Sequence, residues 1–426
     1  MREKLLGRLL TLKDLGDEIQ EDYVRLEGMT EKSASRIQCN RCGTIHSKAA
    51  VKLEIKAYYC PECINMGRIR SDQWLYHLPQ EDFQTRKLLS WTGKLTAYQQ
   101  EISDRLVIAV QKREQILVHA VTGAGKTEMM YHAVHEALLQ GGMVGIATPR
   151  IDVCIELHIR MTRDFNLPIA LLHGEGEPYF RTALVIATTH QLLRFREAFS
   201  LLIIDEVDAF PFRDNDMLYF ATKRSRKPDS TLIYLTATST ENLDKQVKSG
   251  GLKKVALARR FHGNPLVVPK MLWQKKFKNF FRKQRQSGFP LLIFAPEIEF
   301  GQSFAENLQK EYPDESVGFV ASTTENRLDI VSQFRSQELT ILVTTTILER
   351  GVTFPKVDVF VYNAGHFNFT SSALVQIAGR AGRSPERPTG LVYFFHEGKS
   401  KDMIRAIKEI KKMNTLGGFN KNKGII

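Results

Sequence analysis

The sequence lacks any run of about eighteen apolar residues, so no segment is expected to cross a membrane as a helix. The stretch Met1–Leu6 is charged and no apolar region or cleavage site follows it, which argues against a secretory signal. Acidic side chains are outnumbered, with 47 Asp and Glu against 60 Lys and Arg. The formal charge of +13 predicts a polyanionic partner, nucleic acid before an anionic membrane, with solubility alone as the alternative.

Cysteine is also scarce, with five in 426 residues, and four of them form two C-x-x-C pairs. Seventeen residues separate Cys39 and Cys42 from Cys60 and Cys63, a spacing typical of a four-thiolate zinc site. Two disulfides or a redox motif are the alternatives, and a reducing cytosol disfavours the disulfides. We expect one structural Zn²⁺, with a small hairpin within residues 49–59 between the two pairs.

The central motif is a glycine-rich loop between an apolar run and a helical pattern. The run Gln115–Ala120 leads into Val-Thr-Gly-Ala-Gly-Lys-Thr, the A-x-T-G-x-G-K-T form of nucleic-acid motor ATPases. Such a loop directs backbone N–H groups at phosphates, Lys126 would contact the outer phosphates, and Thr127 would ligate Mg²⁺. The expected ATP-binding residues of this loop are Thr122, Gly123, Ala124, Gly125, Lys126 and Thr127.

Two adjacent carboxylates follow the apolar run Leu201–Ile204, which reads as a buried parallel strand. Ligands of open α/β sheets bind at the carboxyl ends of such strands. We expect Asp205 to hold Mg²⁺ through water and Glu206 to polarise the attacking water. A further apolar strand ends in Thr236-Ala-Thr238, which suits a hydroxyl relay.

Other strand ends carry polar groups suited to nucleotide or strand binding. Gln99, in Leu95–Gln100, resembles the adenine-reading glutamine of superfamily 2 helicases; a polar helix start is the alternative. Thr148, Arg150 and Thr188 follow apolar strands, where hydroxyl and basic groups bind phosphates. We expect these three residues to contact nucleic acid.

A second alternation of strands and helices begins near residue 263 and has no phosphate loop. It carries Thr345–Gly351 and Gln376–Arg383, and in the latter Arg380 and Arg383 lie three apart on an expected short Gly-rich helix. Two guanidinium groups on one face can stabilise a transferring phosphoryl group. An ion pair with a surface carboxylate is the alternative.

The segment Lys270–Arg285 holds seven basic and no acidic residues, with aromatic residues at helical spacing. We expect an amphipathic helix that packs its aromatic side chains beneath the second sheet. Its basic face is available to line a nucleic-acid groove.

Together these motifs resemble superfamily 2 helicases over roughly residues 93 to 400. The preceding cysteine pairs, the sequence Asp-Glu-Val-Asp at 205–208 and Glu349-Arg-Gly351 further resemble the ComFA family of late-competence ATPases from naturally transformable Gram-positive bacteria. The resemblance implies use of ATP, Gly351 and Gln376 in the nucleotide site, and Thr345 on nucleic acid. It also implies ATP-driven handling of single-stranded DNA entering through a membrane channel, with ComFC and DprA as partners. Thr353 stands where many members of the superfamily have Asp.

The expected fold is α/β, with two tandem RecA-like parallel-sheet lobes and an N-terminal four-cysteine zinc-binding module. The expected divisions are a helical segment 1–35, a zinc module 36–92, an ATP-binding lobe 93–262, a second lobe 263–412 and a basic tail 413–426. We expect a translocase in the cytosol, with a peripheral place at the inner face of the membrane and a homo-oligomer left open. A PriA-like replication-restart or repair helicase, an RNA helicase and a zinc-module scaffold with a weak ATPase are the alternatives.

Overall fold

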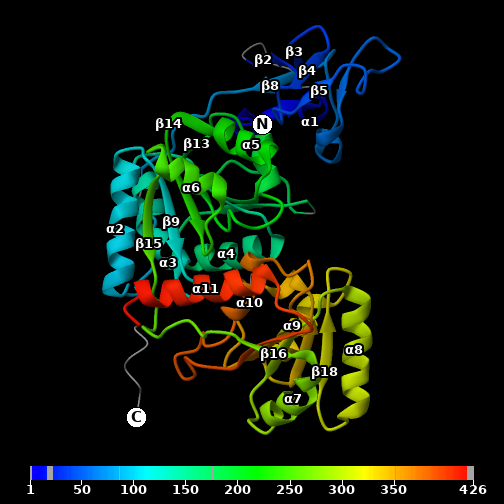
Figure 1. The fold of residues 1–426 in the computed structure, drawn as a ribbon. Coiled ribbons are helices and arrows are strands. Elements are labelled where there is room, and N and C mark those ends of the chain that lie inside the picture. Colours follow the sequence, from blue (N-terminus) through cyan, green and yellow to red (C-terminus); the bar gives the residue numbers. More distant parts are fainter. Residues whose placement is uncertain (1, 17–22, 86, 175, 351, 420–426) are drawn as a thin grey trace. The chain divides into compact units, whose positions relative to one another are not determined.

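Two β-sheets flanked by helices carry most of the chain in the computed structural model (Figure 1). The structure describes residues 2–16, 23–85, 87–174, 176–350 and 352–419. Contacts divide the chain into unit 1, Met1–His119 with Thr127–Val255, and unit 2, Ala120–Lys126 with Ala256–Ile426. None of the helices in these described ranges is both long and apolar enough to span a bilayer.

The sheet of unit 1 has the strand order β11-β12-β10-β13-β14-β9-β15, and the strands from β11 to β9 run parallel. Its central strands are apolar and buried along their length, as expected of a parallel sheet covered on both faces. The strands are β9 (Gln115–Ala120), β10 (Val144–Thr148), β11 (Ile169–Leu172), β12 (Leu184–Thr188), β13 (Phe199–Ile204), β14 (Arg226–Thr236) and β15 (Lys253–Leu257). The helices are α2 (Ala97–Gln111), α3 (Lys126–Leu139), α4 (Ile151–Asp164), α5 (Asp216–Ser225), α6 (Glu241–Lys248) and the 3-10 helix η3 (Thr189–Arg194).

The sheet of unit 2 is parallel throughout, with the order β16-β21-β20-β17-β19-β18. Rings from α7 and from strands β20 and β21 dominate its core. The strands are β16 (Lys270–Trp273), β17 (Leu291–Phe294), β18 (Val317–Val320), β19 (Ile341–Thr344), β20 (Asp358–Val361) and β21 (Val392–His396). The helices are η4 (Gln274–Lys276), α7 (Phe277–Arg285), α8 (Ile298–Glu311), α9 (Arg327–Arg335), η5 (Thr346–Leu348), α10 (Ser371–Ala378) and α11 (Lys401–Leu416). The two parallel-sheet lobes confirm the predicted fold class.

The N-terminal module consists mainly of short antiparallel strands, and within the described part of the expected helical segment 1–35 only Arg2–Lys4 and Leu12–Leu15 are helical. Strands β1 (Leu9–Thr11) and β2 (Val24–Glu27) flank β8 (Trp74–His77), and β4 (Arg36–Cys39) lies between β3 (Met29–Glu31) and β5 (Ile45–Ser47). The expected boundary at residue 35 therefore falls inside a sheet. The remaining elements are η1 (Arg2–Lys4), α1 (Leu12–Leu15), β6 (Tyr59–Cys60), η2 (Pro61–Met66) and β7 (Ile69–Arg70).

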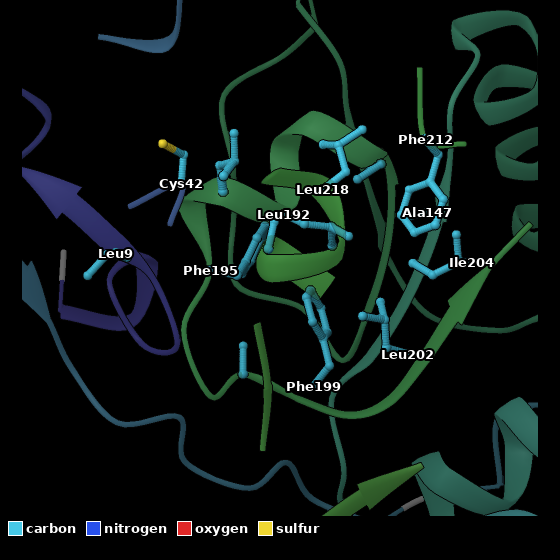
Figure 2. Close-up of a cluster of buried hydrophobic side chains, with 14 of the residues drawn as sticks. Leu9, Cys42, Ala147, Leu192, Phe195, Phe199, Leu202, Ile204, Phe212 and Leu218 are labelled. Carbon is cyan, nitrogen blue, oxygen red and sulfur yellow. The ribbon is translucent and has the colours of Figure 1, made fainter. Parts of the chain in front are cut away.

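The module shares one continuous apolar core with the first sheet. Figure 2 shows Leu9 and Cys42 in the same buried cluster as Leu192 and Phe195 of the η3 region and Leu218 of α5. All five side chains are at most 1% exposed. The cysteine module is thus built onto lobe 1 through apolar packing, and the contact division accordingly counts both in unit 1.

The small hairpin expected within 49–59 is confirmed: Lys52 and Tyr58 form an antiparallel bridge, and the Tyr59 N–H donates to the Val51 carbonyl at 3.0 Å. Two further pairings, β4 with β5 and β6 with β7, each lie next to a cysteine pair.

Two other local expectations need correction. The helix expected from Lys270 begins at Phe277, because residues 270–273 form edge strand β16 against β21. The tail expected from residue 413 starts as helix: α11 continues to Leu416, with Met413 buried.

Candidate nucleotide-binding and metal sites

The phosphate loop connects β9 to α3, as the sequence predicted. Gly123 and Gly125 both have φ of 77°, in the left-handed region that favours glycine. Within the loop the Ala124 N–H donates to the Val121 carbonyl at 3.2 Å. Lys126 and Thr127 open α3 and are only half-buried, so their polar groups are accessible at the helix N-terminus. This geometry suits phosphate binding.

The carboxylate pair lies directly after β13. The Asp205 N–H donates to the Ala147 carbonyl of the neighbouring β10 at 2.8 Å. The Glu206 N–H donates to its neighbour's Oδ1 at 2.8 Å, and Glu206 has φ of 56°, a left-handed conformation that a non-glycine residue seldom adopts. This turn presents two carboxylates from one buried strand end.

Asp208, which the sequence reasoning left out of the site, joins this turn to the end of β14. Its Oδ1 accepts a hydrogen bond from Thr236 Oγ1 at 2.8 Å, and its Oδ2 accepts one from the Thr238 hydroxyl. The Thr238 N–H also donates to Thr236 Oγ1 at 3.0 Å. Its place as the fourth residue of the Asp-Glu-Val-Asp sequence was the signal by which it could have been found. Asp208 holds the two threonine hydroxyls next to the carboxylate turn.

Gln99 forms the capping box of α2. Its Oε1 accepts hydrogen bonds from the Thr96 N–H at 2.9 Å and from Thr96 Oγ1 at 3.0 Å. The Thr96 hydroxyl in turn accepts from the Gln99 N–H at 3.4 Å. Gln99 is 6% exposed, so its amide carbonyl here serves the helix start that the sequence offered as the alternative. Adenine recognition by Gln99 remains a prediction.

The threonines at the strand ends lie side by side. Parallel pairing of β10 with β12 places Thr148 opposite Thr188 in register. Both side chains are buried, and the Thr148 hydroxyl has no hydrogen-bond partner within the described part of the chain. Arg150, at the start of α4, and Thr345, at the end of β19, are half-buried and more accessible.

The arginine-bearing stretch is a turn, not the expected short helix. Helix α10 ends at Ala378 with Gly379 as its cap, and Gly382 has φ of 68°, which breaks helical continuity. Arg380 is 1% exposed, and its Nε donates to the Glu349 carbonyl at 3.1 Å. Arg383 is half-buried; its Nε donates to the Gly379 carbonyl at 3.0 Å and its Nη1 to Thr353 Oγ1 at 3.3 Å. We call residues 379–383 the arginine turn.

Arg260, a residue without a motif of its own, holds the arginine turn. Its Nη1 donates to the Ala381 carbonyl at 2.8 Å and to that of Gly382, and its Nη2 to that of Gly379 at 3.4 Å. Burial, with a lesser effect from the charge of Arg383, lowers the pKa of Arg260 to about 9, which still leaves the guanidinium charged at neutral pH. In the sequence, the only sign of this role is that Arg260 belongs to a basic pair at 259–260.

The phosphate loop itself is counted with unit 2 and lies against this turn. The Phe261 N–H donates to the Gly123 carbonyl at 3.1 Å. A methyl group at Gly379 would lie 2.1 Å from Thr122 Oγ1, so only glycine fits there. Gln376, one turn earlier on α10, is 4% exposed, and its Nε2 is buried without a hydrogen-bond partner among the described residues. Gly351, the other nucleotide residue expected in this lobe, lies outside the described residues.

The four cysteine sulfurs form one buried cluster. All Sγ atoms of Cys39, Cys42, Cys60 and Cys63 lie within 4.8 Å of one another, and none is in a disulfide. The Gly43 N–H donates to the Cys39 carbonyl at 2.8 Å, closing the first knuckle. Four convergent buried thiols fit a tetrahedral metal site. The expected grouping of these four residues is confirmed; the identity of the ion stays a prediction.

Two arginines support the cluster. Arg41, 1% exposed, donates from Nε to Cys63 Sγ at 3.4 Å and from Nη2 to the Cys63 carbonyl at 3.0 Å. Arg224 of α5 donates to the carbonyls of Asn40 and Arg41 in the first knuckle and, at 2.7 Å, to the Leu193 carbonyl in η3. The knuckle is therefore tied to the segment that directly follows Thr188.

The comparisons with known proteins agree with this architecture. Residues 2–77 match the Competence protein ComFA N-terminal domain, 96–246 the DEAD/DEAH box helicase domain and 274–385 the Helicase conserved C-terminal domain. Competence protein ComFA of Streptococcus pneumoniae (strain ATCC BAA-255 / R6) is 53% identical, covering 97% of this chain and 98% of the relative. The chain belongs to the ComFA family. Competence protein ComFA of Bacillus subtilis (strain 168) is 38% identical, covering 93% of this chain and 90% of the relative.

Membership confirms the predicted family and gives a helicase-like ATPase class related to competence, with use of ATP and Mg²⁺. Among solved structures, S. cerevisiae Dbp5 bound to RNA and ADP BeF3 is similar, with a TM-score of 0.57 and 15% identity. The match covers 77% of this chain and 93% of that one. At this identity the likeness shows the fold of the two lobes alone.

Proposed function

We propose that this chain is an ATPase driven by single-stranded DNA, and that it moves transforming DNA into the cell during natural competence. Family membership supports the competence role, and the charge of +13 supports a polyanionic strand as partner. No described element offers an obvious wedge for separating strands, so translocation is proposed in preference to processive duplex unwinding.

The observation that carries this proposal is one hydrogen bond between neighbouring strands. The Asp205 N–H donates to the carbonyl of Ala147, the residue immediately before Thr148. In register, Thr148 lies beside Thr188, and Arg150 follows on the same chain segment. A strand bound at these residues would thus act on backbone that is directly bonded to the carboxylate turn. This linkage supports hydrolysis that responds to DNA.

The chemical roles follow from the groups present. Lys126 and the loop N–H groups bind the phosphates, with Thr127 and Asp205 holding Mg²⁺, which neutralises phosphate charge when bound. Glu206 accepts the proton of the attacking water. Arg383 and Arg380 stabilise charge on the transferring phosphoryl group. Thr148, Arg150 and Thr188 of the first lobe and Thr345 of the second are assigned to contact with the strand.

We also propose that the four cysteines bind one Zn²⁺ that stabilises the module and supplies no chemistry to hydrolysis. The convergence of four buried thiols, with Arg41 donating to one of them, supports this assignment. ComFC, DprA and the membrane DNA-uptake channel are proposed partners on the strength of the family alone.

The proposed function is tested by ATP hydrolysis of the full chain with single-stranded DNA, duplex DNA and RNA at several salt concentrations. We expect single-stranded DNA to stimulate hydrolysis most, with stimulation weakening as salt rises. Equal hydrolysis rates with and without each nucleic acid would overturn the proposal. Preferential stimulation by RNA would identify the chain as an RNA-driven ATPase instead.

A further inference from the structure

The carboxyl-end edge of the second sheet carries aromatic side chains that the ATPase does not use. Trp273 and His396 are register partners at the ends of β16 and β21, with ring centroids 5.1 Å apart. Tyr362 follows the end of β20, whose Val361 is in register with Phe294 of β17. Four neighbouring strands therefore end in, or next to, aromatic rings.

Beside them, three rings stack into a platform. Phe300 in the first turn of α8 lies 5.4 Å from Tyr362 with the rings inclined by 24°, and 5.7 Å from Phe304 with an inclination of 22°. Phe300 is 37% exposed and Trp273 51%. Near-parallel rings with an exposed face are the geometry on which nucleobases stack.

A cavity of about 270 Å³ opens next to the platform, between the residues after β16 and helix α8. Its lining includes Phe277, Phe304 and Tyr362 together with the side-chain amides of Gln274 and Asn307. The Gln274 Oε1 is buried and has no hydrogen-bond partner among the described residues. Aromatic walls and an unpaired amide oxygen suit a nucleobase, which has both flat faces and polar edges.

The charge around this edge is positive. Lys278 donates to both carboxylate oxygens of Glu311, at 2.9 and 3.1 Å, and is thereby neutralised. Lys275 and Lys276 are exposed and have no ion pair within the described ranges. Two unneutralised lysines beside exposed rings are the combination that binds a single strand without sequence preference.

This edge continues the proposed path of single-stranded DNA from Thr345, which favours DNA as its ligand. Thr345 follows β19, and β19 pairs with β17 so that Thr344 is opposite Phe294. From β19 to β16 the sheet edge crosses four strand spacings of ~4.8 Å, roughly 19 Å. A stacked strand at ~3.4 Å per nucleotide would cover that span with about six nucleotides.

Resting on the proposed function, we propose that single-stranded DNA continues from Thr345 along this edge and stacks bases on Phe300 and Trp273, with Lys275 on a phosphate. We call these residues, with Tyr362 and Gln274, the aromatic edge. An acidic protein segment is the rival occupant, and the experiment below separates the two.

The test is binding of the full chain to a labelled oligothymidine of about 20 nucleotides, longer than the 4–16 usual for one binding domain. We expect Trp273→Ala and Phe300→Ala each to weaken binding roughly 5- to 150-fold without changing the salt dependence. Trp273→Phe should restore most of the affinity because it keeps a stacking face. Lys275→Gln should lower the slope of log affinity against log salt by about 0.7.

The matched control is Ile404→Ala on α11, which removes an apolar side chain 50% exposed, close to the 51% of Trp273. If Trp273→Ala and Phe300→Ala bind like this control while wild type binds tightly, the aromatic edge is not a DNA site and an acidic protein partner becomes its occupant. If wild type itself binds no single strand at low salt, the proposed function fails together with this inference.

Discussion

Two arginines, one in each unit, hold functional segments by donating to backbone carbonyls. In unit 1, Arg224 bonds carbonyls of the first cysteine knuckle and of Leu193 and Phe195 in the η3 region. In unit 2, Arg260 bonds three carbonyls of the arginine turn. Burial lowers the pKa of Arg224 to about 10 and that of Arg260 to about 9, and both remain charged at neutral pH.

The difference lies in what each arginine connects. Arg260 lies in the segment before β16 and holds the turn that contains the arginines assigned to the phosphoryl group. Arg224 joins the cysteine module to the segment that follows Thr188, and Thr188 is assigned to binding of single-stranded DNA. The same kind of contact, an arginine bonded to backbone carbonyls, therefore supports phosphoryl transfer in one unit and strand binding in the other. Loss of Arg260 should lower kcat, whereas loss of Arg224 should raise the half-saturating concentration of DNA.

The largest effect is expected inside the arginine turn. Arg383→Ala should lower DNA-stimulated hydrolysis by ~10³–10⁵-fold, the range of an arginine finger. Nucleotide binding should weaken only modestly because Lys126 and the loop remain. Lysine at this position should rescue poorly because it lacks the planar fork. Hydrolysis titrated with single-stranded DNA for wild type, Arg383→Ala and Arg383→Lys decides this, and normal stimulation of the alanine variant would refute the role.

Weakening the support of that turn should cost less. Arg260→Lys keeps the charge but loses the fork, and a displacement of ~1 Å at a catalytic group can cost about 10²-fold in kcat. Half-saturation by DNA should change little. The matched control is Arg259→Lys, next in the chain, whose guanidinium lies over the Phe419 ring 5.3 Å away. Equal kcat values for the two variants would show that the turn does not depend on Arg260.

In the cysteine module the corresponding support is Arg41. Arg41→Lys should lower zinc affinity by about 10- to 100-fold, the usual cost of losing a group that orients a metal ligand. Competition with a chromogenic chelator measures this, starting from an expected one zinc per chain. Arg70→Lys in the same module is the control, because Arg70 pairs with Asp72. Purified protein without zinc would contradict the metal assignment itself.

The smallest effect is expected where the module meets lobe 1. Arg224→Lys should raise the half-saturating concentration of single-stranded DNA by about 2- to 30-fold, the scale of a mutation on a coupling route. The hydrolysis rate without DNA should stay at the wild-type level. If Arg224→Lys instead changes the hydrolysis rate without DNA and leaves the half-saturating DNA concentration unaltered, Arg224 does not act on strand binding.

The sequence predicted the features that depend on continuous local signals. The strands of both lobes are apolar runs, and the phosphate loop and the carboxylate pair directly follow two of them. The predicted fold class was confirmed for this reason. The N-terminal strands were missed because they are short and some, such as β2, are mostly exposed, so they lack an alternating apolar pattern and their pairing depends on distant partners. Edge strand β16 was read as helix because its residues continue the basic pattern of α7.

Within the site, the sequence named groups whose chemistry is recognisable and missed those that act through position. Asp208, Arg260 and Arg224 carry out their roles through hydrogen bonds to residues 28 or more positions away. No spacing rule marks such contacts. The arginine turn was expected to be helical because two Gly-spaced arginines three apart fit helical periodicity, whereas Gly382 adopts a left-handed conformation.

The central claim is that this chain moves along single-stranded DNA at the expense of ATP. The most direct measurement is displacement of streptavidin from a biotin at either end of an oligothymidine, with ATP, for wild type and Glu206→Gln. We expect wild type to displace it from one end only, and the variant, with hydrolysis lower by at least ~10²-fold, to displace none. Stimulated hydrolysis without displacement from either end would contradict translocation.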